Sequence, residues 1–230
     1  MILFICVLAL LLFFVVYKYF RVTLLEVQGN DTVQTDAIIA LSGIKIDDNL
    51  FSIDKDTVKS NINTDPYLEY FDLKRIYPST VRIEVFERTP IAMIVHNDKG
   101  YVVDRDANIL EIVMDNEMGL IRIDGLGIKD PIVGQKLTSE NLYETEALID
   151  IVKGSNFSLL SEHIEKINFN NVNATVMTSK QGFKIKFGQS KMAYEKSIWI
   201  DSVIKELAEL EVYDGIINVS SGTSATYSEK

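Results

Sequence analysis

The chain has 230 residues, of which 47% are hydrophobic, and its formal net charge at neutral pH is −10. Nucleic-acid binding needs a basic surface to meet the phosphates, so this acidic balance argues against a nucleic-acid partner. The length and apolar content fit two folded domains, and the single cysteine, Cys6, leaves no disulfide within the chain.

The N-terminal run from Met1 to Phe20 is almost entirely Leu, Ile, Val and Phe, and its first charge is Lys18. As a helix it would span roughly 30 Å, the thickness of a bilayer core. No basic residue precedes the run and no small-residue cleavage site follows it, so we interpret residues 1–21 as an uncleaved transmembrane anchor rather than a signal peptide. Cys6 would be one more apolar residue of this span. The positive-inside rule places the more basic end of a span in the cytoplasm. Lys18 and Arg21 lie at the C-terminal end of this run, so the rule, taken literally, places the rest of the chain in the cytoplasm.

Residues 22–89 read strand–helix–helix–strand–strand. The predicted elements are a strand at Leu24–Val27, a helix from Thr35 to Gly43, a strand-like piece at Leu50–Ile53, a helix from Asp54 or Asp56 to Pro66, and strands at Tyr70–Ile76 and Thr80–Arg88. In the last strand, Val81, Ile83 and Val85 alternate with polar residues, which is typical of a sheet with one wet face. This predicts two helices packed on one face of a three-stranded sheet.

Residues 90–219 predict a mixed β domain with flanking helices, followed by a polar tail at 220–230. The expected strands are Ile91–His96, Gly100–Val103, Ile109–Val113, Leu120–Ile123, Ile164–Phe169, Ala174–Thr178, Phe183–Phe187 and Gly215–Val219, and the expected helices are Glu140–Val152 and Met192–Leu210. The predicted fold class is therefore α+β, with an anchor, a small α/β-layered domain and a mixed β domain.

Chemical motifs are few. The two histidines, His96 and His163, lie far apart in sequence and are interpreted as ordinary hairpin and loop residues. Asp104-x-Asp106-x-Asn108 begins like a calcium loop, but the sixth and twelfth positions lack the required Gly and Glu, so we interpret it as a polar turn. We find no nucleophile elbow or phosphate-binding glycine loop. The sequence therefore predicts no catalytic residue, metal, cofactor or small-molecule substrate.

Several short stretches together resemble a known domain. They are Val27-Gln28-Gly29-Asn30, Leu41-Ser42-Gly43-Ile44, Asn49-Leu50-Phe51-Ser52-Ile53-Asp54, Asp65-Pro66-Tyr67, Lys74-Arg75-Ile76-Tyr77-Pro78-Ser79-Thr80-Val81 and Glu84-Val85-Phe86-Glu87-Arg88-Thr89-Pro90-Ile91-Ala92. In this order, just after an apolar run, they resemble the POTRA domain of the FtsQ/DivIB family of bitopic bacterial cell-division proteins. The resemblance continues through Gly182–Phe187, Met192–Leu210 and Gly215–Val219.

The resemblance implies a non-enzymatic scaffold of the division machinery at the septum. It implies a cytoplasmic N-terminus and an extracytoplasmic body, which is the opposite of what Lys18 and Arg21 indicate. The implied partners are small bitopic proteins of the FtsB/DivIC and FtsL types. By position, the implied partner-binding residues are Gly215, Ile216, Ile217, Asn218, Val219 and Tyr227.

A last strand at Gly215–Val219 would leave unpaired backbone groups at a sheet edge, onto which a partner strand could add. Many family members carry an acidic residue and an arginine where this chain has Asn218 and Ser220. Strand pairing through backbone hydrogen bonds would not depend on these two side chains. Two alternative functions remain open: a POTRA-containing component of polypeptide transport, and a membrane-anchored cell-wall enzyme that uses a carboxylate pair.

Overall fold

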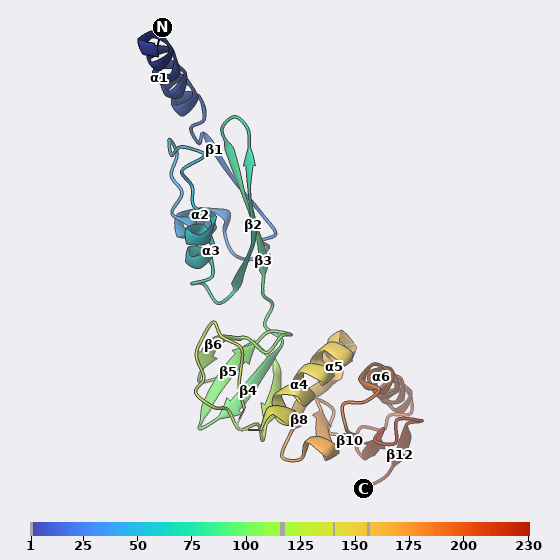
Figure 1. The fold of residues 1–230 in the computed structure, drawn as a ribbon. Helices are drawn as coiled ribbons and strands as arrows, with labels where there is room; N and C mark the ends of the chain where they lie inside the picture. Colours follow the sequence, from blue (N-terminus) through green and yellow to red (C-terminus); the bar gives the residue numbers. More distant parts are fainter. Residues whose placement is uncertain (1, 116–117, 140, 156) are drawn as a thin grey trace. The chain divides into compact units, whose positions relative to one another are not determined.

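A computed structural model describes residues 2–115, 118–139, 141–155 and 157–230. The chain divides into two compact units, Met1–Arg88 and Thr89–Lys230 (Figure 1). Each unit has a hydrophobic core of its own.

The first unit contains one sheet and two packed helices. Its elements are α1 (Ile2–Tyr19), β1 (Leu24–Gln28), α2 (Thr35–Ser42), α3 (Lys55–Ile62), β2 (Leu68–Ile76) and β3 (Thr80–Glu87). The strand order is β1-β3-β2, with β1 parallel and β2 antiparallel to the central β3. The predicted arrangement of two helices on a three-stranded sheet is confirmed.

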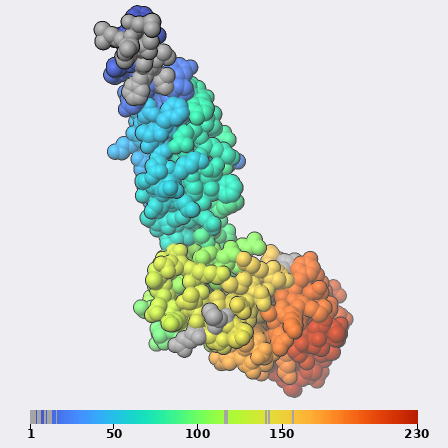
Figure 2. Space-filling model, in the orientation of Figure 1, coloured from blue at the N-terminus to red at the C-terminus, as the bar shows by residue number. Residues whose placement is uncertain are grey.

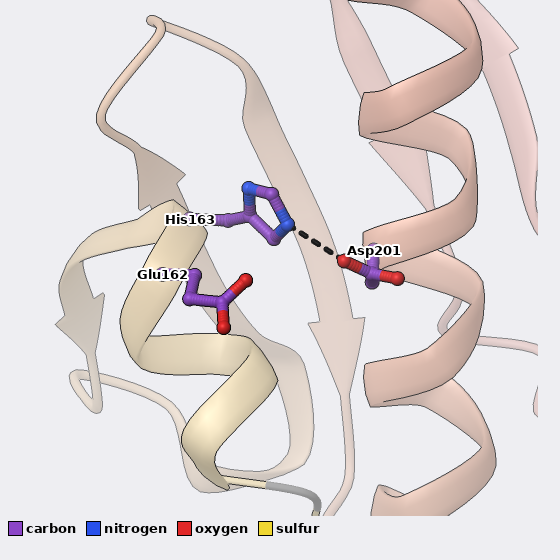
Figure 3. A group of neighbouring side chains, drawn as sticks. All are labelled: Glu162, His163 and Asp201. Carbon is purple, nitrogen blue, oxygen red and sulfur yellow. Dashed lines mark hydrogen bonds and ion pairs between the residues drawn. The ribbon is translucent and has the colours of Figure 1, made fainter.

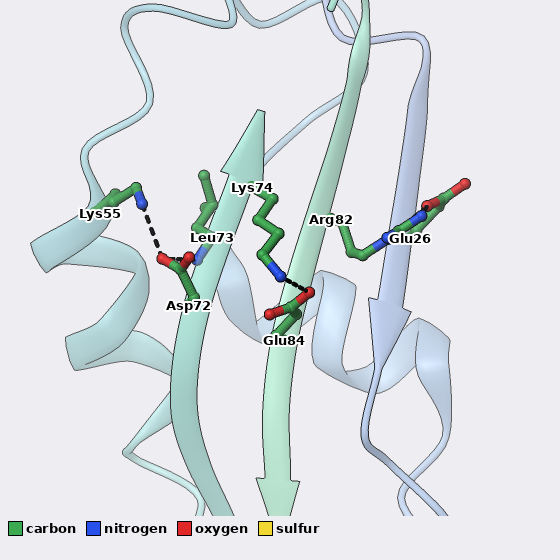
Figure 4. Close-up of polar contacts among 7 residues, drawn as sticks. All are labelled: Glu26, Lys55, Asp72, Leu73, Lys74, Arg82 and Glu84. Carbon is green, nitrogen blue, oxygen red and sulfur yellow. Dashed lines mark hydrogen bonds and ion pairs between the residues drawn. The ribbon is translucent and has the colours of Figure 1, made fainter. Parts of the chain in front are cut away.

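The alternation of β3 explains the two faces of this sheet. Val81, Ile83 and Val85 are buried in the core of the unit, together with Ile38 of α2 and Val58 of α3. The opposite face carries charged side chains and the exposed Phe86, and Figure 4 shows its cross-strand ion pairs, Glu26–Arg82 at 2.9 Å and Lys74–Glu84 at 2.6 Å. At least one side chain of each pair is more than a third exposed, and such pairs contribute about 1 kcal/mol or less, so the apolar face supplies most of the stability.

The strand-like piece predicted at Leu50–Ile53 is wrong, because this segment forms a turn. Leu50 is fully buried, which accounts for the apolar signal. The Arg75 guanidinium donates to the carbonyls of Leu50, at 2.8 Å, and of Ile53, at 2.6 Å. Since a side chain occupies these carbonyls, no neighbouring strand is needed to satisfy them.

Glu87, at the end of β3, fixes the loop that follows β1. Its carboxylate accepts hydrogen bonds from the backbone N–H groups of Asp31, Thr32 and Val33, at 2.6 to 3.1 Å. Burial favours the neutral acid, but these hydrogen bonds outweigh burial and hold the pKa of Glu87 below its ordinary value. The carboxylate is therefore a structural anion of the first unit.

We predict that Glu87→Gln lowers the free energy of unfolding of the first unit by about 1–3 kcal/mol at pH 7, because charged acceptors form the stronger hydrogen bonds. The folded pKa of Glu87 is depressed, so its contribution is present above the unfolded pKa of about 4.3 and is lost as pH falls through the folded pKa. Urea denaturation at pH 7 and pH 3.5 should show the difference narrowing in acid. Glu69→Gln, at an exposed ion pair with Arg88, is the control and should cost less than about 1 kcal/mol.

The second unit is built on a single mixed sheet. Its elements are β4 (Ala92–His96), β5 (Lys99–Val103), β6 (Ile109–Val113), β7 (Ile121–Asp124), α4 (Leu142–Gly154), α5 (Phe157–His163), β8 (Ile164–Asn168), the 3-10 helix η1 (Val172–Ala174), β9 (Thr175–Ser179), β10 (Lys184–Gly188), α6 (Ala193–Glu209), β11 (Ile216–Asn218) and β12 (Thr226–Ser228). The strand order is β12-β11-β10-β9-β8-β7-β4-β5-β6. The expected mixed β domain with helices is confirmed, while α5 and β12 were not predicted.

The core of the second unit lies between this sheet and the helices. Leu148 and Ile151 of α4 and Ile200 and Ile204 of α6 are buried with the inward side chains of the strands. Ile167 of β8 is among those strand residues and is fully buried. The other face of the sheet carries mainly polar side chains along β8, β9 and β10, since alternate residues there are exposed or half-buried.

The polar turn predicted at Asp104–Asn108 is confirmed. One carboxylate oxygen of Asp104 accepts from the backbone N–H groups of Asp106, at 2.9 Å, and of Asn108, at 2.8 Å. The other oxygen accepts from the Asn108 side-chain amide at 2.8 Å. Asp106 forms an ion pair with Lys153 of α4. These carboxylates therefore hold the connection between β5 and β6.

Within the part of the chain that the structure describes, no helix combines the length and the apolar character needed to cross a membrane. The interpretation of Cys6 falls on a side chain outside the described residues. Glu140, the predicted first residue of the helix at 140–152, also lies outside them.

Candidate partner-binding edge

The predicted partner-binding segment, Gly215–Val219, does not lie at a sheet edge. β11 lies between two strands: it is parallel to β10, with Ile217 opposite Ile185, and antiparallel to β12, with Ile217 opposite Tyr227. The prediction that Gly215–Val219 forms the free edge is therefore wrong. The edge strand is β12, within the segment expected to be a polar tail.

The chain reverses after β11 because the following residues are suited to a turn. The Asn218 side-chain oxygen accepts from the Ser220 N–H at 3.0 Å and the Ser220 hydroxyl at 2.7 Å. Gly222 has φ of +72° and donates its N–H to the Val219 carbonyl at 3.2 Å. The Ser/Thr/Gly composition that suggested a tail is thus the composition of a hairpin loop.

A weak sequence signal for β12 does exist. Ala225 and Tyr227 are two residues apart and both pack against the core of the second unit. Thr226 and Ser228 alternate with them and are exposed. This is the period-two pattern of a strand, but over four residues it is too short to identify one.

Tyr227 is held by its own chain. Its hydroxyl donates to the Asp214 carbonyl at 3.0 Å, and Lys230 pairs with the Asp214 carboxylate at 2.9 Å. Gly215 has φ of +134°, and a Cβ there would lie 2.4 Å from a Tyr227 ring carbon. Tyr227 is therefore an ordered part of β12. The Tyr227 side chain packs against Gly215 and holds β12 in place, and a residue with a Cβ at position 215 would clash with the ring.

The six predicted residues thus fall into three groups. Ile217 and Val219 are fully buried core residues. Gly215 and Tyr227 hold β12 in place, whereas Ile216 and Asn218 are half-buried on the open face of the sheet.

The open face of the sheet near this end carries two lysines that sequence reasoning missed. The side chains of Lys184 and Lys186 are exposed on β10, opposite Ile216 and Asn218 in the register. Alternate residues of a strand share a face, so the two ammonium groups lie on the same side of the sheet. Figure 2 shows the red C-terminal residues at the surface of the second unit. These lysines lie two strands in from the edge, because β11 and β12 separate β10 from it.

A second cluster of titratable side chains lies where α5 meets α6. Glu162 and His163 end α5, and Asp201 lies on α6 (Figure 3). Among the described residues, this is the one group of three or more potential metal ligands whose atoms all lie within 4.8 Å. His163 Nε2 lies 2.8 Å from Asp201 Oδ1, and Lys205 Nζ lies 2.8 Å from the same oxygen. The interpretation of His163 as an ordinary loop residue is wrong, because it ties two helices together.

Both oxygens of the Asp201 carboxylate have partners, because Lys205 Nζ also donates to Oδ2 at 3.0 Å. Burial opposes its ionisation, but hydrogen bonds from Lys205 and His163 outweigh burial and hold the pKa of Asp201 below its ordinary value. A cation bound here would have to displace the Lys205 ammonium. The arrangement thus suits a structural link better than the carboxylate pair that a cell-wall hydrolase would use.

We predict that Asp201→Asn lowers the free energy of unfolding of the second unit by about 1–3 kcal/mol at pH 7, since the variant loses two charge-assisted hydrogen bonds. The depressed folded pKa means that this stability is present above the unfolded pKa of about 3.9 and is lost as pH falls through the folded value. Urea denaturation at pH 7 and pH 3 measures both effects. Glu195→Gln, at an exposed residue in the first turn of the same helix, should change stability by less than about 0.5 kcal/mol.

Comparison with known proteins gives consistent matches. The family model described as POTRA domain, FtsQ-type, matches residues 20–88. Cell division protein DivIB of Clostridium tetani is 29% identical over 212 residues, which are 89% of this chain and 77% of that protein. Cell division protein FtsQ of Geobacter sp. is 29% identical over 189 residues, 81% of this chain and 68% of that protein. The solved major extracytoplasmic domain of the trans isomer of DivIB from Geobacillus stearothermophilus has a TM-score of 0.37 and 11% identity, covering 54% of this chain and 96% of that one.

Proposed function

Because this chain belongs to the FtsQ/DivIB family of cell-division proteins with a POTRA domain, we propose that it is a non-enzymatic scaffold of the division machinery. In this proposal, residues 1–21 attach it to the cell membrane and both folded units lie outside the cytoplasm, concentrated at the septum. Its partners are bitopic division proteins of the FtsB/DivIC and FtsL types. One of them binds by adding a strand to the C-terminal edge of the sheet.

The observation that carries this proposal is the position of β12 at the end of the nine-stranded sheet. An edge strand presents backbone N–H and C=O groups on its outer side, and an extended peptide can pair with them. The exposed side chains of Thr226 and Ser228 flank that edge. The docking strand in this proposal is β12, and β11, within Gly215–Val219, pairs with it on its inner side.

Attachment through residues 1–21 is supported by the surface of α1. Large apolar side chains there are exposed, including Phe4 at 73%, Phe14 at 61% and Val15 at 64%. A row of exposed apolar side chains on one helix needs an apolar environment to be stable. The acidic composition of the rest of the chain, by contrast, gives it little attraction to anionic lipid.

Site-specific photo-crosslinking in dividing cells tests the docking strand. A crosslinking amino acid placed at Thr226 should trap a bitopic partner of the FtsB/DivIC type. The same amino acid at Tyr143, which is 73% exposed on α4, is the control and should trap none. Crosslinks at Tyr143 but not at Thr226 would place the partner on the helical side of the sheet and contradict strand addition.

A fluorescent fusion combined with external protease tests the location. We expect a band at midcell and cleavage of the folded units by protease added outside the cells. Uniform membrane fluorescence would instead favour the transport alternative. Units protected from the protease would support the cytoplasmic orientation that Lys18 and Arg21 indicate.

A further inference from the structure

Four aromatic rings gather where α1 meets the rest of the first unit. Phe20 contacts Tyr19, Phe51 and Tyr77, with ring centroids 5.4, 5.1 and 5.8 Å apart, and Phe51 lies 5.9 Å from Tyr77. The four come from three places: the end of α1, the turn before α3 and the tip of the β2–β3 hairpin. We refer to Tyr19, Phe20, Phe51 and Tyr77 as the aromatic collar.

The collar is exposed although its rings touch one another. Tyr19 is 64% exposed, Phe51 54% and Tyr77 61%. Contact among the rings has therefore not removed them from solvent, and only Phe20 is half-buried against the core. An exposed group of large aromatic side chains on a small folded unit marks an interaction surface.

Two hydrogen bonds to backbone carbonyls fix the collar beside the last turn of α1. The Leu50 N–H donates to the Phe20 carbonyl at 2.8 Å, and the Asn49 side-chain amide donates to the Tyr17 carbonyl at 3.2 Å. The turn that carries Phe51 is thus held against the end of the helix. The collar continues the exposed apolar surface of α1 onto the folded unit, and this continuity identifies its occupant.

We propose that the aromatic collar lies in the interfacial layer of the phospholipid bilayer to which α1 attaches the chain. This inference rests on the membrane attachment in the proposed function. Aromatic rings favour the boundary between acyl chains and headgroups, and the Tyr19 and Tyr77 hydroxyls can remain in the wet layer. Lys18 and Arg21 flank Tyr19 and Phe20 in the sequence, so their side chains could reach the lipid phosphates.

Docking at two separate loops constrains the first unit more than a single helix can. A helix that leaves the membrane fixes one point, whereas Phe51 and Tyr77 add two more from different parts of the fold. Because the rings contact one another, they form one patch beside the helix end, and its contact with the membrane would restrict the swinging of the small domain about the end of α1.

Fluorescence quenching by brominated lipids tests this in the full chain, reconstituted into vesicles of phosphatidylethanolamine and phosphatidylglycerol. The chain has one tryptophan, Trp199, so Phe51→Trp in a Trp199→Phe background carries a single indole. Phe71→Trp in the same background is the matched control, because Phe71 is 59% exposed and also contacts a second exposed ring, Phe86. We expect lipids brominated on the acyl chain to quench the Phe51→Trp variant several-fold more than the Phe71→Trp variant. Tyr77→Trp should behave like Phe51→Trp.

Equal quenching of the Phe51→Trp and Phe71→Trp variants in vesicles that retain the protein would overturn the collar proposal while leaving membrane attachment intact. Protein that washes off the vesicles in alkaline carbonate would instead contradict the attachment itself. The two failures are therefore distinguishable. Neither depends on partner binding at β12, so the strand-addition proposal is tested separately.

Discussion

Deletion of residues 224–230 is expected to abolish binding of the FtsB/DivIC-type partner, with a loss of at least about 100-fold in affinity, equivalent to about 2.7 kcal/mol. The deletion removes β12, and with it the backbone groups onto which the partner strand would add. The core of the second unit should survive, because Ile217 and Val219 remain covered by the sheet and the helices. The measurement is titration of the partner's extracytoplasmic segment against the wild-type and shortened chains.

The same deletion separates two versions of strand addition. If the partner paired with β11, as the sequence alone suggested, removing β12 would uncover that strand and binding would be kept or strengthened. Deletion of residues 229–230 is the matched control. It spares β12 and removes only the exposed ion pair between Lys230 and Asp214, so affinity should stay within about twofold.

Gly215→Ala is expected to release β12 from the sheet and to lower the free energy of unfolding of the second unit by about 1–3 kcal/mol. Two effects add. The residue has φ of +134°, which side chains with a Cβ rarely adopt, and the new methyl group would lie 2.4 Å from the Tyr227 ring and 2.9 Å from the Ser228 carbonyl oxygen. The ring would have to leave its position. Amide hydrogen exchange at residues 226–228 should accelerate, and partner binding should weaken together with it.

Gly134→Ala separates these two effects. Gly134 has φ of +84°, but a Cβ there would meet no atom within 4 Å. Its effect on the free energy of unfolding therefore measures backbone strain without a clash, and it should be smaller than that of Gly215→Ala. Protection of residues 226–228 that survives Gly215→Ala would show that Tyr227 does not need the glycine to seat the strand.

The elements that the sequence predicted well are those with several apolar residues at a regular period. β3, with its alternating valines and isoleucine, and α6, with Ile200, Ile204 and Leu207 on its buried side, are examples. The misassigned elements are short. Leu50–Ile53 is apolar because Leu50 enters the core from a turn, and α5 has only Leu160 fully buried. In such segments, tertiary contacts and not local periodicity decide the structure.

The segment expected to form the edge of the sheet, Gly215–Val219, lies one strand in from that edge. What the sequence could not provide was the pairing of Thr226–Ser228 with β11, since a three-residue strand is specified by the strand it meets. The seat of Tyr227 against Gly215 is a contact between residues 12 positions apart across a turn. That Lys184 and Lys186 lie beside Ile216 and Asn218 follows only from the pairing of β10 with β11.

The unbroken hydrogen-bonded order from β12 to β6 makes the second unit a spacer between the two ends of one sheet. Eight steps between neighbouring strands, at about 4.8 Å each, separate these ends by roughly 38 Å along the sheet. Because every step is a backbone ladder, this separation cannot stretch without breaking hydrogen bonds. A molecule bound at β6 and a strand bound at β12 would therefore be held at a fixed separation.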